Sequence, residues 1–181
     1  MNVIRTAIPD VLLLEPRVFG DDRGFFFESY NQRALAEKAG IAAPFVQDNH
    51  SRSACGVLRG LHYQIQQPQG KLVRVIAGAI FDVAVDIRRS SSTFGKWVSV
   101  ELTAANKLMA WVPVGFAHGF LTLSDHAEVL YKTTDFWAPE HERTIAWDDS
   151  DLGIVWPLSN PPTLSDKDRR GARLGDAAVF P

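Results

Sequence analysis

The chain has 181 residues, of which 46% are hydrophobic and 22% charged, with a formal net charge of -2. This is the composition of an ordinary globule with a sizeable core, and the lack of a basic excess argues against a general nucleic-acid binder. The single cysteine excludes an intrachain disulfide framework, and no apolar run approaches the ~20 residues of a membrane span.

Two elements are predicted in the first quarter of the chain. Phe25 to Phe27, followed by Glu28, forms an apolar run that reads as a strand, with Glu28 as a plain exposed residue unless it has a function. Residues 31–40 are predicted to form a helix, which Asn31 caps and Gly40 ends in a left-handed conformation. Asp10 and Glu15 bracket the only apolar run near the N-terminus, residues 11–14, so we expect no signal peptide and a cytoplasmic location.

The dominant signal lies in the middle of the chain and is strand-like. From Phe81 to Ile87 the odd positions are apolar and the even ones small or acidic, which predicts a half-buried strand. Gly78 is predicted to form the turn before it. Further strands are predicted over residues 72–76, 97–102, 107–114 and 120–123. Short strands separated by turn residues favour an all-β sandwich or barrel over alternating strand–helix units.

The rest of the chain adds little regular structure. The tail from Pro157 is rich in Pro, Asp and Arg, and only one short helix is predicted there, near residues 167–170. The sequence has no internal repeat, low-complexity tract or linker, so we expect one domain over residues 1–181.

Two histidines lie in motifs similar to those of cupins, many of which bind metals. The usual first motif is His-x-His followed by Glu, but here His62 is followed by Gln64 and the acidic position is not filled. The second motif, Pro-x-Gly-x-x-His, is intact and ends at His118. A stable transition-metal site needs about three protein ligands, and Gln replaces imidazole poorly. We therefore expect no metal, and a metal-dependent cupin remains the weaker alternative.

His62 is also the best candidate for a general base, because neutral imidazole is the default base near neutral pH. Arg59 precedes it and Lys71 follows it, a basic lining that suits an anionic ligand. Each residue also has a purely structural interpretation: His62 as a core histidine and Lys71 as a solvated lysine. Taken alone, Tyr131 is interpreted as an ordinary aromatic residue of a strand, and the sequence around Asp168 does not indicate a particular function.

Long, irregular sequence blocks resemble the dTDP-4-dehydrorhamnose 3,5-epimerase family. The first is Gly-Val-Leu-Arg-Gly-Leu-His-Tyr-Gln at residues 56–64, and the last is Leu-Ser-Asp-Lys-Asp at residues 164–168. Between them, the matching blocks lie at residues 69–75, 80–88, 94–97, 113–120, 131–135, 139–143 and 147–149. The resemblance spans roughly residues 18–168, and blocks of this length in this order are far more specific than a lone histidine.

The resemblance implies a dimeric, all-β, cupin-like jelly-roll barrel with a few short helices and an active site inside the barrel. By position, His62 matches the catalytic base, Asp168 its partner and Tyr131 the general acid. Lys71 matches a pocket residue, and a cationic Lys71 would stabilise an enolate oxygen. The residues that the resemblance places at the substrate are Arg23, Glu28, Gln47, Asn49, Arg59, His118, Trp137, Glu142 and Lys167.

The implied activity is inversion of C3 and C5 of dTDP-4-keto-6-deoxy-D-glucose, giving dTDP-4-keto-L-rhamnose, in dTDP-L-rhamnose biosynthesis for cell-envelope polysaccharide. Hydrogens on carbons beside a ketone are acidic because the carbanion delocalises onto oxygen. We therefore expect no cofactor, and the sequence has no Gly-x-Gly-x-x-Gly fingerprint. Open alternatives are a C3-only or C5-only epimerase of a related dTDP-4-keto sugar, a ketoisomerase, and a non-catalytic sugar-nucleotide-binding module.

Overall fold

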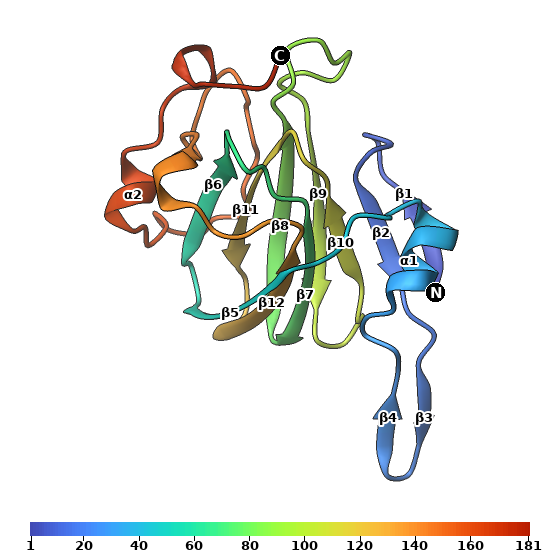
Figure 1. Cartoon of the computed structure of the whole chain (residues 1–181). Helices are drawn as coiled ribbons and strands as arrows, with labels where there is room; N and C mark the ends of the chain where they lie inside the picture. Colours follow the sequence, from blue (N-terminus) through green and yellow to red (C-terminus); the bar gives the residue numbers. More distant parts are fainter.

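The computed structural model describes all 181 residues, and its centre is a pair of antiparallel β-sheets that face each other (Figure 1). The first sheet contains, in spatial order, β1 (Asn2–Arg5), β2 (Leu12–Glu15), β10 (Met109–Val112), β7 (Lys71–Ala77), β12 (His126–Thr133) and β5 (Gln47–Ala54). The second contains β13 (Glu142–Thr144), β6 (Leu58–Gln64), β11 (Phe116–Thr122), β8 (Ala79–Asp86) and β9 (Trp97–Thr103). From β5 to β13 the chain crosses between the sheets at nearly every turn, as in a jelly roll. The predicted all-β, cupin-like class is thereby confirmed.

The remaining elements are short. They are the hairpin β3 (Phe19–Asp21) and β4 (Gly24–Phe26), the helices α1 (Gln32–Ala39) and α2 (Asp166–Arg169), and the 3₁₀ turns η1 (Pro139–His141) and η2 (Leu174–Asp176). None of the helices combines the length and apolar character needed to cross a membrane. The helix predicted near residues 167–170 forms as α2, one residue earlier.

Local sequence rules account for the ends of α1 and for the turn before β8. The Asn31 side chain accepts a hydrogen bond from the Ala34 N–H, and Gly40 ends the helix with φ 72°. Gly78 joins β7 to β8 with φ 74°, and a Cβ atom there would lie 2.0 Å from the His126 carbonyl oxygen. Only glycine fits that turn. The predicted strand over residues 107–114 forms as the shorter β10, and the one over residues 120–123 as the longer β11.

The prediction that β8 is half-buried is wrong, because both of its faces are covered. Val83 and Val85 pack on the outer side against Leu152 and Trp156, which belong to the segment that follows β13. The even positions face the barrel interior, where Asp82 is only 2% exposed. The acidic residues of this strand are therefore interior side chains rather than solvated ones.

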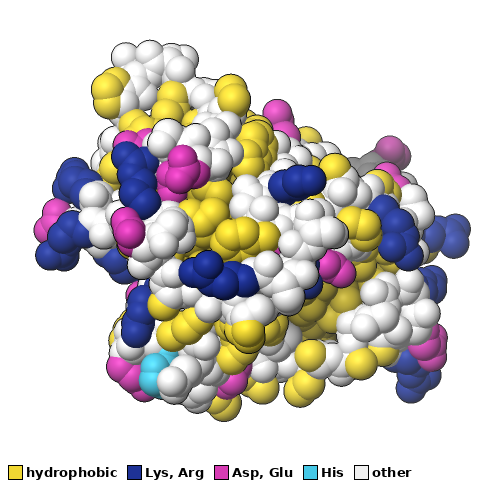
Figure 2. All heavy atoms as spheres, turned by 90° about the horizontal axis from the view of Figure 1, so that it is seen from above, with side chains coloured by type: hydrophobic (Ala, Val, Ile, Leu, Met, Phe, Trp, Pro, Cys, Tyr) yellow, Lys and Arg dark blue, Asp and Glu magenta, His cyan; other side chains and the backbone are white.

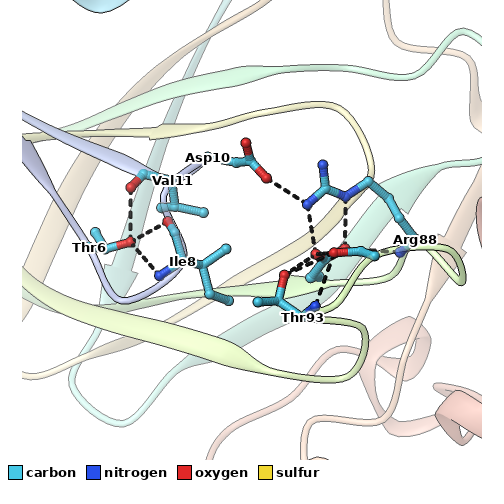
Figure 3. Close-up of polar contacts among 8 residues, drawn as sticks. Thr6, Ile8, Asp10, Val11, Arg88 and Thr93 are labelled. Carbon is cyan, nitrogen blue, oxygen red and sulfur yellow. Dashed lines mark hydrogen bonds and ion pairs between the residues drawn. The ribbon is translucent and has the colours of Figure 1, made fainter.

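A polar cluster ties the end of β8 to the N-terminal loop (Figure 3). The Arg88 guanidinium donates to Asp86 and, at 2.8 Å, to Asp10. Burial alone would raise the pKa of Asp86, but hydrogen bonds from Arg88, Ser91 and Thr93 outweigh burial and lower that pKa to about 2. Every member of the cluster has a partner, so its role is structural.

The surface has two notable features, a projecting apolar hairpin and a face of mixed charge. The β3–β4 hairpin projects away from the two sheets (Figure 1), and its Phe25 and Phe26 are 64% and 69% exposed. Seen from above, basic and acidic side chains are interspersed among apolar ones (Figure 2). That face therefore carries no continuous basic field of the kind that binds nucleic acid.

Candidate active site

A cavity of about 200 Å³ is lined by side chains from both sheets. Its lining residues are Gln47, Asn49, His62, Gln69, Lys71, Tyr131, Trp137 and Glu142. Seven of these eight are residues to which the sequence analysis gave a catalytic or binding role, and only Gln69 was missed. The structure thus brings most of the predicted site together.

Strand alternation and register explain why these side chains meet. Tyr131 on β12 lies opposite Asn49 on β5 and Val73 on β7, so it faces the barrel interior together with Asn49. His62 lies on β6 in the other sheet, opposite His118 on β11. His62 and Tyr131 therefore approach the cavity from opposing sheets.

His62 is held by a buried carboxylate. Its Nε2 lies 2.6 Å from Oδ1 of Asp168, which comes from α2 and is 3% exposed. The Gly60 N–H donates to the same oxygen at 3.2 Å, and the Ser165 hydroxyl donates to Oδ2 at 2.6 Å. Burial alone would raise the pKa of Asp168, but the hydrogen bonds from His62, Ser165 and Gly60 prevail and lower that pKa to about 2.

The same surroundings favour a neutral imidazole. Burial lowers the pKa of His62, the hydrogen bond to Asp168 opposes that effect, and the positive charge of Lys167 adds to it. An ionised carboxylate can only accept, so the Nε2 that contacts Asp168 carries the proton. The Nδ1 of His62 is then the free basic nitrogen, which suits a general base.

Lys71 is a buried cation with spare donors. Its Nζ donates to the His62 carbonyl oxygen at 3.2 Å, and burial lowers its pKa to about 8, with Glu142 and Asp82 acting in the opposite direction. An ammonium group has three N–H donors, and only this one contact uses them. A buried, partly satisfied ammonium group at the cavity is suited to an oxygen that becomes negatively charged.

Tyr131 stays protonated in this setting. Burial and the negative charge of Glu142 raise the pKa of its phenol, and Arg59 opposes that shift. Arg59 is itself exposed, and its Nε donates to Ser53 Oγ at 2.9 Å. A protonated phenol on the sheet opposite His62 can deliver a proton.

A second histidine–carboxylate pair lies on the strands behind His62. The His118 Nε2 lies 2.8 Å from Asp82 Oδ2, and both residues are buried. The sequence analysis missed Asp82, although an acidic residue on the even, inward positions of residues 81–87 was the signal for it. His118 does not line the cavity, so its contact with substrate stays a prediction.

The remaining predicted residues divide into two groups. Glu142 lines the cavity and accepts from Lys167 Nζ at 2.9 Å, which places Lys167 beside the site. Arg23 pairs with Asp21 in the exposed hairpin, and Glu28 accepts from the Asn31 side chain at 2.9 Å. Neither Arg23 nor Glu28 lines the cavity of its own chain.

The interior offers no metal-ligand set. No group of three His, Cys, Asp or Glu side chains is placed to hold an ion. The Nε2 atoms of His62 and His118 each contact a carboxylate, and the Gln64 amide is hydrogen-bonded to three backbone groups. The two histidines instead each pair with a buried carboxylate.

A jelly-roll barrel that encloses a His–Asp pair, a buried lysine and a protonated tyrosine defines a cupin-like enzyme that works by proton transfer. Residues 5–176 match the family model of dTDP-4-dehydrorhamnose 3,5-epimerase. A protein of that name from Pseudomonas aeruginosa is 67% identical over 181 residues, covering all of both chains. The chain belongs to the dTDP-4-dehydrorhamnose 3,5-epimerase family, and it is an isomerase.

Two solved structures add detail. The dTDP-6-deoxy-D-glucose-3,5-epimerase of Legionella pneumophila, in complex with dTDP-4-keto-L-rhamnose, has a TM-score of 0.96 and 52% identity, covering 98% of this chain and 94% of that one. A 3′-monoepimerase from Streptomyces bikiniensis, in complex with dTDP-quinovose, has a TM-score of 0.89 and 34% identity, covering 94% and 87%. The fold is therefore shared by enzymes that invert one carbon and by enzymes that invert two.

Proposed function

We propose that this protein converts dTDP-4-keto-6-deoxy-D-glucose into dTDP-4-keto-L-rhamnose by inverting C3 and C5. The observation that carries the proposal is the placement of His62, paired with Asp168, and Tyr131 on opposing sheets of one cavity. A base on one face of a sugar ring and an acid on the other are what inversion requires. The identity to the Pseudomonas relative and the ligand of the Legionella structure support this substrate.

In the first step, His62 Nδ1 removes the hydrogen from a carbon beside the ketone. The C–H electron pair forms the C–C double bond of an enolate, and the ketone oxygen takes the negative charge. Lys71 Nζ stabilises that oxygen, while Asp168 stabilises the imidazolium that forms. Because the ketone is already present, the step needs no oxidant.

In the second step, Tyr131 delivers a proton to the opposite face of the same carbon. The double bond returns its electron pair to that carbon, the ketone re-forms and the configuration is inverted. Solvent then reprotonates Tyr131 and takes the proton from His62. A second round at the other activated carbon completes the conversion.

Two residues that line the cavity and Arg59, whose charge acts on Tyr131 from outside the lining, supply the remaining contacts of the proposal. Trp137 is 59% exposed and lines the cavity, so its indole can stack on the nucleobase. Arg59 provides a forked donor suited to diphosphate oxygens. Asn49 lines the cavity beside Tyr131 and can bind sugar hydroxyls.

We further propose that the enzyme is a homodimer in which each hairpin reaches the site of the other copy. The exposed Phe25 and Phe26 leave an apolar surface that a second copy can cover, and Arg23 and Glu28 lie outside their own cavity. Mixing Arg23→Ala with His62→Ala tests this proposal. If sites are shared, heterodimers regain activity that neither variant has alone. Purely additive residual activity would contradict the proposal.

We also propose a cytoplasmic location and a role in supplying L-rhamnose for cell-envelope polysaccharide. A diphosphate-linked sugar is charged and does not cross membranes unaided, so its epimerase works where the substrate is made. Cell fractionation with an antibody against the protein tests the location, and recovery mainly in the membrane fraction would contradict it.

The test of the reaction itself is incubation with dTDP-4-keto-6-deoxy-D-glucose in deuterated water, followed by NMR. Deuterium at both C3 and C5 with inversion at both carbons is the expected result. Deuterium and inversion at one carbon alone would make the protein a C3-only or C5-only epimerase, like the Streptomyces relative at C3. Lack of exchange at either carbon would refute the proposal.

A further inference from the structure

The buried side chain of Gln64 forms hydrogen bonds with the backbone of residues 135–138, a segment that lies outside both sheets. The Gln64 amide nitrogen donates to the Phe136 carbonyl at 3.1 Å and to the Gln67 carbonyl at 2.7 Å. Its amide oxygen accepts from the Ala138 N–H at 2.9 Å. Gln64 therefore forms hydrogen bonds with the residues immediately before and after Trp137.

Two more glutamines hold the same segment. The Gln69 amide donates to the Asp135 carbonyl at 2.8 Å, and the Trp137 N–H donates to Gln47 Oε1 at 3.0 Å. Together with Gln64, they bond the backbone of all four residues from 135 to 138. Gln47 was predicted as a ligand contact, and here its amide oxygen is occupied by the segment.

The other hydrogen bonds to the segment come from its near neighbours in the chain: the Thr133 hydroxyl donates to the Asp135 carbonyl at 2.9 Å, and the His141 N–H donates to the Ala138 carbonyl at 3.0 Å. The segment lies between β12 and η1, outside both sheets, and the side chains of Phe136 and Trp137 are each 59% exposed. Burial of these aromatics therefore contributes little to fixing the segment. The glutamine hydrogen bonds therefore hold the backbone that carries the Trp137 indole at the cavity.

Gln64 itself cannot act by touching the ligand. It is 4% exposed and does not line the cavity, whereas Trp137 does. It lies two residues after His62 on β6, so both side chains point to the same side of the strand. One strand thus orients both the base and the aromatic segment.

We propose that Gln64 is a positioning residue that sets nucleotide affinity by holding Trp137 in place for stacking on the base. The inference rests on the proposed function, because it takes a nucleoside diphosphate sugar as the ligand. A neutral amide donates and accepts at once, so one side chain bonds the carbonyl of residue 136 and the N–H of residue 138. The position where a metal cupin has its second histidine is here used to orient the aromatic segment.

The substitutions Gln64→Glu and Gln64→Met test this role. In the first variant, an ionised carboxylate cannot donate to the two carbonyls, and in the second, a thioether chain keeps the length but loses every bond. Gln66→Glu is the matched control for Gln64→Glu. It makes the same chemical change two residues away, at an exposed position. Calorimetry measures the affinity for dTDP, and steady-state kinetics measure kcat and KM.

Both Gln64 variants are expected to bind dTDP more weakly, by up to the roughly 5- to 150-fold that loss of a base–aromatic stack brings. The value of kcat is expected to change by less than about twofold, because the His62–Asp168 pair, Lys71 and Tyr131 are untouched. In a Trp137→Ala background, the same Gln64 substitutions are expected to have no further effect on dTDP affinity.

Affinity that is unchanged in the Gln64 variants, or that falls equally in the Trp137→Ala background, would overturn the inference. If neither Gln64 variant folds, Gln64→Asn, whose amide is one methylene too short to bond both residue 136 and residue 138, carries the same expectation and the same refutation. A parent protein that neither binds dTDP nor epimerises the sugar would instead refute the proposed function.

Discussion

The buried ammonium group of Lys71 predicts where the enzyme loses activity in alkali. Burial lowers the pKa of this lysine from 10.5 to about 8. At a pH below this pKa the side chain is cationic and stabilises the enolate oxygen. At a pH above it the side chain is neutral and cannot stabilise that oxygen. The value of kcat/KM is therefore expected to fall through an alkaline limb near pH 8.

The size of the effect follows from the titration. At pH 9, about one tenth of a lysine with a pKa near 8 remains cationic, against more than about nine tenths of an ordinary lysine. Activity is therefore expected to drop about tenfold between the optimum and pH 9. The assay is kcat/KM from pH 5 to 10, because this ratio reports groups of the free enzyme.

Lys71→Arg identifies the group responsible for the limb. A guanidinium stays charged throughout this range, so the variant is expected to lose activity overall but to keep what remains up to pH 10. Lys96→Arg, at an exposed position, is the control and is expected to keep the limb near pH 8. A limb that stays near pH 8 in Lys71→Arg, or a parent limb above pH 10, would refute the role of Lys71.

Three further predictions concern the base, its carboxylate partner and the metal. His62→Ala is expected to lower kcat by on the order of a hundredfold or more with the fold retained by circular dichroism, and near-normal turnover would make His62 a structural residue. Asp168→Asn is expected to slow turnover severely by disturbing the imidazole tautomer, with substrate binding by calorimetry little changed; unaltered kcat would leave Asp168 a purely structural partner. Activity is expected to survive prolonged chelation, and a loss restored by one divalent ion would show a metal enzyme.

Local patterns in the sequence were enough to predict most of the fold. The Asn31 and Gly40 caps, the Gly78 turn and the strand over residues 97–102 depend on neighbours along the chain, and each forms as expected. The covering of β8 was not predictable in this way. Its outer face packs against Leu152 and Trp156, which come from a segment far along the chain, beyond β13.

In the candidate site, too, some features were predictable from the sequence and others depend on the tertiary structure. Local sequence context singled out His62 and Lys71, and the family resemblance added Tyr131. All three side chains line the cavity. The pairing of His118 with Asp82 depends on the register of β11 against β8, which no single segment encodes. The expectation of one domain over residues 1–181 stays a prediction.

Two predicted residues show the limit of a single chain. Arg23 and Glu28 matched the family pattern but lie in or beside the projecting hairpin, away from the cavity. A sequence motif states which residues act together and not which copy supplies them. That is why the dimer enters as a proposal with its own mixing test.

The central claim is that Tyr131 and His62 act on opposite faces of the sugar. Tyr131→Phe keeps the ring but removes the proton that inverts the carbon, while His62 and Lys71 still form the enolate. His62 should then return a proton to the original face, after exchange with deuterated solvent. NMR of the recovered sugar is expected to show deuterium with retained configuration, and a ratio of exchange to inversion above that of the parent. If exchange and inversion fall by the same factor, Tyr131 is not the opposite-face acid and the account is wrong.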